Sequence, residues 1–121
     1  MVRFEIPGSP VPKERPRRSA SGHYYTPART RRYEQTVAAA AQVAGVSLDP
    51  QKRYRATAWF YVSRACDGDN CLKSILDALR LYGQPQGWDD RQVQEGHYYV
   101  ETVPRGKECA LVEIEPLEAT A

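Results

Sequence analysis

The sequence predicts an α/β fold of the α+β type, in which two helices pack on one face of a small mixed β-sheet. Short runs of alternating apolar and polar residues indicate half-buried strands. Two longer stretches with apolar residues every three or four positions indicate amphipathic helices. The chain has 121 residues, of which 41% are hydrophobic, and this suits one core. We therefore expect a single domain over residues 1–121.

The first strand is followed by a segment of a different kind. Val2, Phe4 and Ile6 alternate with polar residues, which predicts a half-buried strand. Prolines and glycines are then frequent as far as Pro16, and they interrupt helices and strands alike. We therefore expect an extended, basic, proline-rich loop over about residues 8–26.

The first helix is expected to start near Pro27, because a proline in the first turn loses no helical hydrogen bond. Gly45 suits the end of this helix. One face carries the apolar residues Tyr33, Val37, Ala40, Ala41 and Ala44. Arg29, Arg31 and Arg32 lie near the N-terminal end, where the helix dipole disfavours cations. Their position indicates that these arginines serve a partner outside the helix.

A strand and a second helix follow. The strand at residues 53–63 directs alternate residues to one side, namely Tyr54, Ala56, Ala58, Phe60 and Val62. The second helix is expected to begin with Asp69 or Asn70 as its N-cap and to stop at Gly83. Its buried face is predicted to consist of Leu72, Ile75, Leu76 and Leu79.

Two further strand-like runs lie at about residues 97–103 and 108–115. Gly106 lies between them, and glycine favours tight turns. We therefore expect the two runs to pair with each other as a hairpin.

The composition excludes several classes of protein. No apolar stretch approaches the roughly 20 residues that a membrane-spanning helix needs, and the first residues lack the apolar core of a secretory signal. Three cysteines without a Cys-x-x-Cys pair, and only two histidines, argue against a disulfide framework and a Cys/His zinc site. We therefore expect a cytoplasmic protein without a membrane partner or a small-molecule cofactor.

Positive charge is concentrated in one segment. Residues 13–32 carry a net charge of +6, whereas the rest of the chain carries −4. The cations are Lys13, Arg15, Arg17, Arg18, Arg29, Arg31 and Arg32. Tyr24, Tyr25 and Tyr33 lie among them, and cations with nearby aromatic rings are typical of nucleic-acid-binding surfaces. A nucleic acid is one expected partner, and a solvated arm without a defined partner is the alternative.

Acidic residues gather at two junctions between predicted elements. Asp67 and Asp69 follow one predicted strand, and Asp89 and Asp90 precede the next. Carboxylates at such junctions can converge in space, and hard oxygen ligands of this kind suit Mg²⁺ or Mn²⁺. A metal ion held there would polarise a phosphodiester. The alternatives are structural, with Asp69 as a helix N-cap, Asp67 with Gly68 as a turn, and Asp89 with Asp90 as a solvated turn.

Lys73 has two interpretations. It lies four residues after Asp69, so both side chains share one face of the second helix. A lysine above a carboxylate cluster would hold a phosphate or an attacking water. The alternative is an ion pair between Lys73 and Asp77 within the helix. The spacing alone does not separate the two.

Two motifs extend over the second half of the chain. The first runs from Asp67 to Leu79 and contains Asp-x-Asp-Asn-x-x-Lys, followed by Asp-Ala-Leu. The second runs from Trp88 to Val93 and contains Asp-Asp-x-Gln-Val. With the proline-rich opening and the Tyr-Thr-Pro at residues 25–27, these motifs resemble the RusA family of Holliday junction resolvases over nearly the whole chain.

The resemblance implies a RusA-like fold and a Mg²⁺-dependent endonuclease, with Mn²⁺ as a substitute, that acts as a homodimer on four-way DNA junctions. The metal-binding catalytic acids implied by motif position are Asp67, Asp69 and Asp90. Lys73 would be the catalytic lysine, and Asn70 and Asp89 would support the site. Gly68 replaces the apolar residue common between the first two acids, and we expect it to loosen that loop.

The expected function is the resolution of four-way junctions by paired, symmetric hydrolysis of phosphodiesters in DNA recombination and repair. A two-fold dimer would place one site on each of two opposed strands. A fold does not fix its substrate, so two alternatives stay open. They are a metal-dependent nuclease that acts on other branched DNA, and a junction-binding accessory protein without catalysis.

Overall fold

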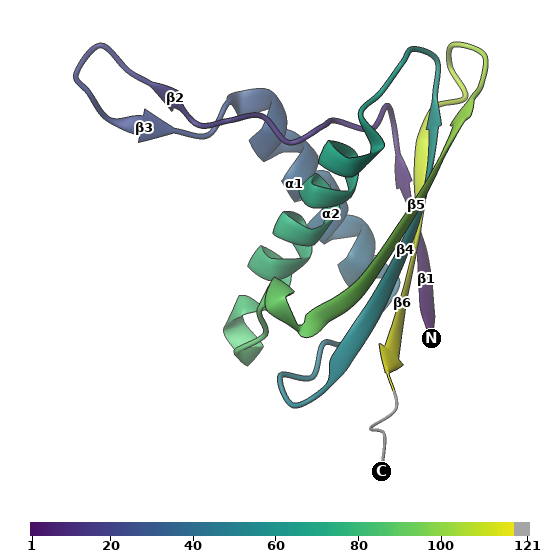
Figure 1. Ribbon diagram of the computed structural model, residues 1–121. Coiled ribbons are helices and arrows are strands. Elements are labelled where there is room, and N and C mark those ends of the chain that lie inside the picture. The colour runs from purple at the N-terminus through teal and green to yellow at the C-terminus, as the bar shows by residue number, and fades with distance from the viewer. Residues whose placement is uncertain (118–121) are drawn as a thin grey trace.

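The computed structural model describes residues 1–117, which form two helices on one face of a four-stranded sheet (Figure 1). The helices are α1 (Ala28–Val43) and α2 (Gly68–Gly83). The strands, in their order across the sheet, are β1 (Val2–Pro7), β6 (Cys109–Leu117), β4 (Arg53–Val62) and β5 (Val93–Thr102). The predicted α+β fold class is confirmed. No helix within residues 1–117 is long and apolar enough to cross a membrane.

β4 provides the centre of the hydrophobic core. Its alternate residues are buried, as the sequence predicts: Tyr54, Ala56, Ala58, Phe60 and Val62. Ile75 and Leu79 of α2 and Val37 of α1 are fully buried in the same cluster. Phe4 and Ile6 of β1 belong to it as well. The core therefore lies between the inner face of the sheet and both helices.

The predicted hairpin between the last two strands is wrong. β4 lies between β5 and β6, and it pairs with β5 in parallel and with β6 antiparallel. The connection at residues 103–108 therefore passes the end of β4, where Val103 N donates to Val62 O over 2.8 Å. Two strand spacings amount to about 10 Å, which this connection spans. Gly106 correctly indicates a turn, but a turn signal does not reveal that a third strand lies between the two.

α2 is the crossover that the parallel pairing of β4 and β5 requires. The chain leaves β4 at one end of the sheet, returns along α2, and enters β5 at the other end (Figure 1). Two 3₁₀ turns, η1 (Gln84–Gln86) and η2 (Asp90–Gln92), complete the return. Trp88 between them is buried and meets Tyr54 edge-on, with ring centroids 6.1 Å apart. The end of β4 and the start of β5 are therefore held at opposite ends of α2.

The loop expected over residues 8–26 contains a small ribbon that the sequence does not predict. β2 (Arg17–Arg18) pairs antiparallel with β3 (Tyr24–Tyr25). Gly22 turns the chain with a φ of 87°, a conformation that favours glycine. Figure 1 shows the ribbon projecting away from both helices. Strands of this length are too short to produce a recognisable alternation of apolar residues.

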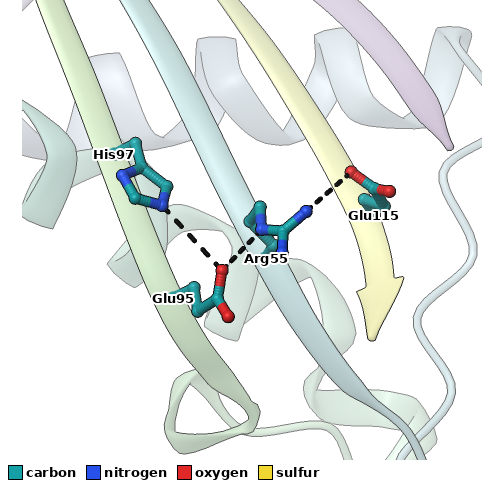
Figure 2. Close-up of polar contacts among 4 residues, drawn as sticks. All are labelled: Arg55, Glu95, His97 and Glu115. Atoms are coloured by element: carbon teal, nitrogen blue, oxygen red, sulfur yellow. Dashed lines mark hydrogen bonds and ion pairs between the residues drawn. The ribbon is translucent and has the colours of Figure 1, made fainter. Parts of the chain in front are cut away.

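The face of the sheet opposite the helices carries a network of charged side chains. Arg55 Nε lies 2.6 Å from Glu95 Oε2, and Arg55 Nη1 lies 3.5 Å from Glu115 Oε2 (Figure 2). His97 Nε2 lies 3.9 Å from the same Glu95 oxygen. The hydrogen bond from Arg55 lowers the pKa of Glu95, and that bond in turn raises the pKa of Arg55. These pairs connect β5, β4 and β6 across the exposed face.

Gly68 lies where side chains of β5 pack against the first turn of α2. A Cβ atom at Gly68 would lie 2.9 Å from Val100 Cγ2 and would overlap the Tyr98 ring. The sequence expectation that this glycine loosens the loop is therefore wrong. The missing side chain allows a close contact between α2 and β5 at the point where Asp67 and Asp69 lie.

We expect Gly68→Ala to lower the free energy of unfolding by about 1–3 kcal/mol, because overpacking outweighs the gain of up to about 1 kcal/mol that alanine brings to a helix. Urea denaturation measures the change. In a double-mutant cycle, Tyr98→Ala should remove part of this penalty, since the overlapping ring is then absent. Strictly additive effects, or a stabilised Gly68→Ala protein, would contradict the packing argument.

Candidate active site

Asp67 is the N-cap of α2. Its Oδ1 accepts a hydrogen bond from Asn70 N at 3.3 Å, and its Oδ2 accepts one from Asn70 Nδ2 at 2.9 Å. The carboxylate satisfies an N–H of the first turn and lies at the positive end of the helix dipole. The cap is therefore Asp67 rather than Asp69 or Asn70, and α2 starts slightly earlier than the sequence predicts. Asn70 fixes the orientation of the Asp67 carboxylate.

Asp69 and Lys73 lie one turn apart on the exposed side of α2. The sequence leaves open whether Lys73 pairs with Asp77. In the structure, Asp77 Oδ2 lies 2.9 Å from Lys13 Nζ instead. Within residues 1–117, Lys73 forms no ion pair. The Lys73 ammonium is therefore exposed on the same side of the helix as Asp69.

Lys13 is predicted to contact DNA, but its side chain is turned toward both helices. Its ammonium lies 3.2 Å from Glu34 Oε1 of α1 and 2.9 Å from Asp77 Oδ2 of α2. Its backbone N–H donates to Asn70 O at 2.9 Å. Burial by itself would lower the pKa of Lys13, but the hydrogen bonds and charges of Asp77 and Glu34 outweigh burial and raise it. Lys13 therefore anchors the proline-rich loop to α1 and α2.

The other cations predicted to bind DNA are exposed: Arg15, Arg17, Arg18, Arg29, Arg31 and Arg32. The first three lie on or next to the projecting ribbon, and the last three lie in the first turns of α1. Glu14 lies 3.4 Å from Arg17 and 3.9 Å from Arg29. Exposed contacts of this length stabilise little, so they leave both guanidinium groups accessible to a phosphate.

Asp89 and Asp90 form the start of η2, just before β5. Asp89 caps this turn by accepting a hydrogen bond from Arg91 N at 3.0 Å. Gln92 Oε1 accepts from Asp89 N at 3.1 Å, and Gln92 Nε2 donates to Lys52 O at 2.7 Å. Gln92 therefore ties η2 to the loop before β4. The Asp-Asp-x-Gln-Val motif includes Gln92 without indicating this role, although the spacing of Gln92 from Asp89 is that of a capping box.

The two neighbouring carboxyl groups have opposite pKa shifts. The backbone hydrogen bond from Arg91 lowers the pKa of Asp89, and the side-chain hydrogen bond with Asp90 lowers it further. Burial raises the pKa of Asp90, as do the hydrogen bond and charge of Asp89 and the charge of Asp77. Negative charge on Asp90 is therefore unfavourable in the folded chain, and a bound cation would relieve it.

Asp90 does not lie beside Asp67 and Asp69, which differs from the expectation that the acids converge. It lies next to the third turn of α2, where its pKa responds to Asp77 and Arg80. Asp77 is about 12 Å from Asp69 along the helix axis. The reason is the parallel pairing of the strands. One acid pair follows the end of β4 and the other precedes the start of β5, at opposite ends of the crossover helix.

The acids fit a hard metal ion in their chemistry but only partly in their arrangement. Within residues 1–117, no three Asp, Glu, His or Cys side chains come together as possible metal ligands. Asp67 and Asp69 supply two carboxylates at the start of α2. Mg²⁺ is often held by one or two carboxylates, with waters and substrate phosphates as the other ligands. One chain therefore offers part of a metal site.

A pocket of about 490 Å³ opens beside Asp67. Arg64, from the loop between β4 and α2, lines it together with Arg105 from the connection between β5 and β6. Arg29 reaches it from the start of α1. The sequence does not single out Arg64 or Arg105, because neither lies in the basic segment. Only the fold brings them together beside an acid of the central motif.

Comparison with known proteins agrees with the motifs. Residues 7–115 match the family model described as endodeoxyribonuclease RusA. The match covers most of the chain and includes all the acids discussed above, together with Lys73. No curated protein matches the chain. The resemblance inferred from the sequence is confirmed, and the chain belongs to the RusA family of endodeoxyribonucleases.

Proposed function

We propose that this protein is a Mg²⁺-dependent homodimeric endonuclease that resolves four-way DNA junctions by paired, symmetric cuts, in DNA recombination and repair. Family membership makes it a metal-dependent nuclease of branched DNA. The observation that supports the proposal best is the first turn of α2. There Asp67 borders an arginine-lined pocket, Asp69 lies two residues later, and the exposed Lys73 follows one turn after Asp69.

Each residue near the start of α2 has a distinct role in the proposed reaction. Asp67, Asp69 and Asp90 would hold Mg²⁺, and the bound ion would supply Lewis-acid polarisation of the phosphodiester. Asn70 holds the Asp67 carboxylate in one orientation, and this fixed geometry lowers the entropy cost of binding. Lys73 Nζ donates to a non-bridging phosphate oxygen, where negative charge increases during hydrolysis. Asp89 supports the site by capping the turn that carries Asp90.

A second copy of the chain contributes to this site. A four-way junction has approximate two-fold symmetry, so a two-fold dimer places one site on each of two opposed strands. Within one chain, Asp90 lies near Asp77, which is about 12 Å along α2 from Asp69, and no three acids come together within residues 1–117. In the dimer, Asp90 of one copy completes the site started by Asp67 and Asp69 of the other.

The exposed arginines supply most of the affinity for DNA. Those on the projecting ribbon and at the start of α1 contact phosphates, so binding weakens steeply as salt increases. Such contacts position the protein but carry little sequence information. Exposed Tyr24 and Tyr25 on the same ribbon offer rings that stack on unpaired bases near the branch point.

We expect Asp69→Asn to lower junction cleavage by at least about a hundredfold and to leave junction binding nearly unchanged, because it removes a metal ligand and not a phosphate contact. The assay compares a synthetic four-way junction with linear duplex of the same sequence, with Mg²⁺ and with chelator. Asp49→Asn is the matched control, since Asp49 accepts a local hydrogen bond from Gln51 N at 2.8 Å.

Other results of this assay would change the proposal. Near-normal nicking by Asp69→Asn would remove this residue from the site. Cutting of junction and duplex alike by the wild-type protein would indicate a broader nuclease. Tight junction binding without cutting by the wild-type protein would favour a non-catalytic accessory.

We expect subunit mixing to restore part of the activity. Asp69→Asn and Asp90→Asn homodimers should both be inactive, because each lacks a ligand in both sites. A heterodimer of the two variants keeps one intact site if Asp69 and Asp90 come from different copies. It should therefore nick one strand per junction, which denaturing gels measure. An inactive heterodimer would place both acids in one chain, and a monomeric wild-type protein would contradict the dimer.

We expect Asp90→Asn to stabilise the metal-free protein at neutral pH. Burial and the nearby Asp89 and Asp77 raise the pKa of Asp90, so the folded state holds this proton more tightly than the unfolded state. Stability is therefore lost as the pH rises through the raised pKa, and the substitution avoids this loss. Urea midpoints in chelator should be higher for the variant at neutral pH and equal to wild type near pH 3. A lower midpoint at neutral pH would show that the Asp90 charge stabilises the fold.

A further inference from the structure

The pocket beside Asp67 combines residues from four distant parts of the chain. Its walls come from the start of the proline-rich loop, the first turn of α1, the loop between β4 and α2, and the connection between β5 and β6. It encloses about 490 Å³ and is partly open to solvent. Asp67, the N-cap of α2, forms part of the wall. The pocket therefore shares a wall with the proposed active site.

The balance of charge in this pocket favours an anion. Arg29, Arg64 and Arg105 line it, against the carboxylates of Asp67 and Glu108. Glu108 is already engaged, since its carboxylate accepts from Ser63 Oγ at 2.8 Å and from Gly106 N at 2.6 Å.

The three arginines of the pocket are free to bind that anion. Arg29 has a single weak contact, 3.9 Å from Glu14. Within residues 1–117, neither Arg64 nor Arg105 forms an ion pair. Arg64 and Arg105 therefore line the pocket without a direct ion pair, although the charge of Arg105 contributes to lowering the pKa of Glu108.

We propose that this pocket is a phosphate subsite in which Arg64 and Arg105 bind a DNA phosphodiester next to the one that is cut, an inference that rests on the proposed nuclease function. Guanidinium groups bind phosphate oxygens through two parallel hydrogen bonds, which fixes both position and orientation. Arg64 lies on the same short loop as Asp67, so a phosphate held by Arg64 aligns the neighbouring linkage with the acids.

The subsite differs in role from the projecting ribbon. The ribbon arginines lie on an extension that reaches away from the helices, so they bind DNA at a distance from the acids (Figure 1). Arg64 and Arg105 lie on connections at the end of the sheet where α2 begins. They are therefore positioning residues for the cleaved strand, and removing them affects binding and the placement of the cut.

The first test measures junction binding in chelator, so that cleavage plays no part. We expect the double variant Arg64→Ala/Arg105→Ala to bind roughly tenfold or more weakly at fixed salt, since it can no longer form hydrogen bonds between charged groups. The slope of log affinity against log salt should fall by about 1 for each phosphate that the variant no longer binds. Arg53→Ala is the matched control, because Arg53 begins β4 and lies roughly 30 Å along the strand from Val62, the end of β4 that precedes Arg64.

The second test locates the bound phosphate. Each test junction carries a single uncharged methylphosphonate. A series of such junctions places it in turn at each of the three linkages on either side of the cut. At one position the neutral linkage should weaken wild-type binding but should not weaken the double variant further, because the same interaction is already absent. The single variants Arg64→Gln and Arg105→Gln, which keep most of the side chain, replace the double variant if it unfolds.

The outcomes separate this subsite from the proposed function. If the double variant has the affinity and salt slope of Arg53→Ala, or if no linkage shows coupling, the subsite is wrong even when the wild-type protein resolves junctions. If the wild-type protein binds junctions but does not cut them, the nuclease proposal fails, and a reduced salt slope with coupling at one linkage would still establish the phosphate interaction.

Discussion

The parallel pairing of β4 with β5 is the constraint on which the rest of the structure depends. Parallel neighbours cannot be joined by a tight turn, so the chain must return along the sheet, and α2 makes this return. The same helix covers the inner face of the sheet and completes the core. Its two ends carry the two acid pairs, with Asp67 and Asp69 at the start and Asp89 and Asp90 beyond the end. The close approach of β5 at Gly68 then fixes the start of α2 against the sheet.

A second constraint is the ion cluster that Lys13 forms with Glu34 and Asp77. Burying charged side chains destabilises the folded protein unless the charges are paired. Here one ammonium pairs with a carboxylate from each helix. The proline-rich loop is therefore held to α1 and α2 at its base, and the ribbon beyond it projects from a fixed point. Lys13 therefore sets the position of the arginines that follow it. Its engagement of Asp77 also leaves Lys73 without its alternative partner.

The site combines opposite charges within a short distance along the chain. A phosphodiester and a divalent cation need cationic and anionic partners side by side, and the loop between β4 and α2 supplies both in Arg64 and Asp67. Asp67 also caps α2, so the hydrogen bonds that stabilise the helix restrict the carboxylate that we propose as a metal ligand. Rigid placement on a helix start suits a catalytic group better than a free loop does. The raised pKa of Asp90 marks a carboxyl group that gains from a cation.

The sequence by itself determined the fold class, the inner face of β4, the buried face of α2 and the family motifs. Each of these depends on residues two to four positions apart, whose spacing follows from the geometry of a strand or a helix. Tertiary structure alone decided four other features. They are the place of β4 between β5 and β6, the inward turn of Lys13, the separation of Asp90 from Asp67 and Asp69, and the meeting of Arg64 with Arg105. The inward turn of Lys13 depends on how the two helices meet, and the other three depend on which strands become neighbours. Both are set by the packing of the whole core, which no local spacing encodes.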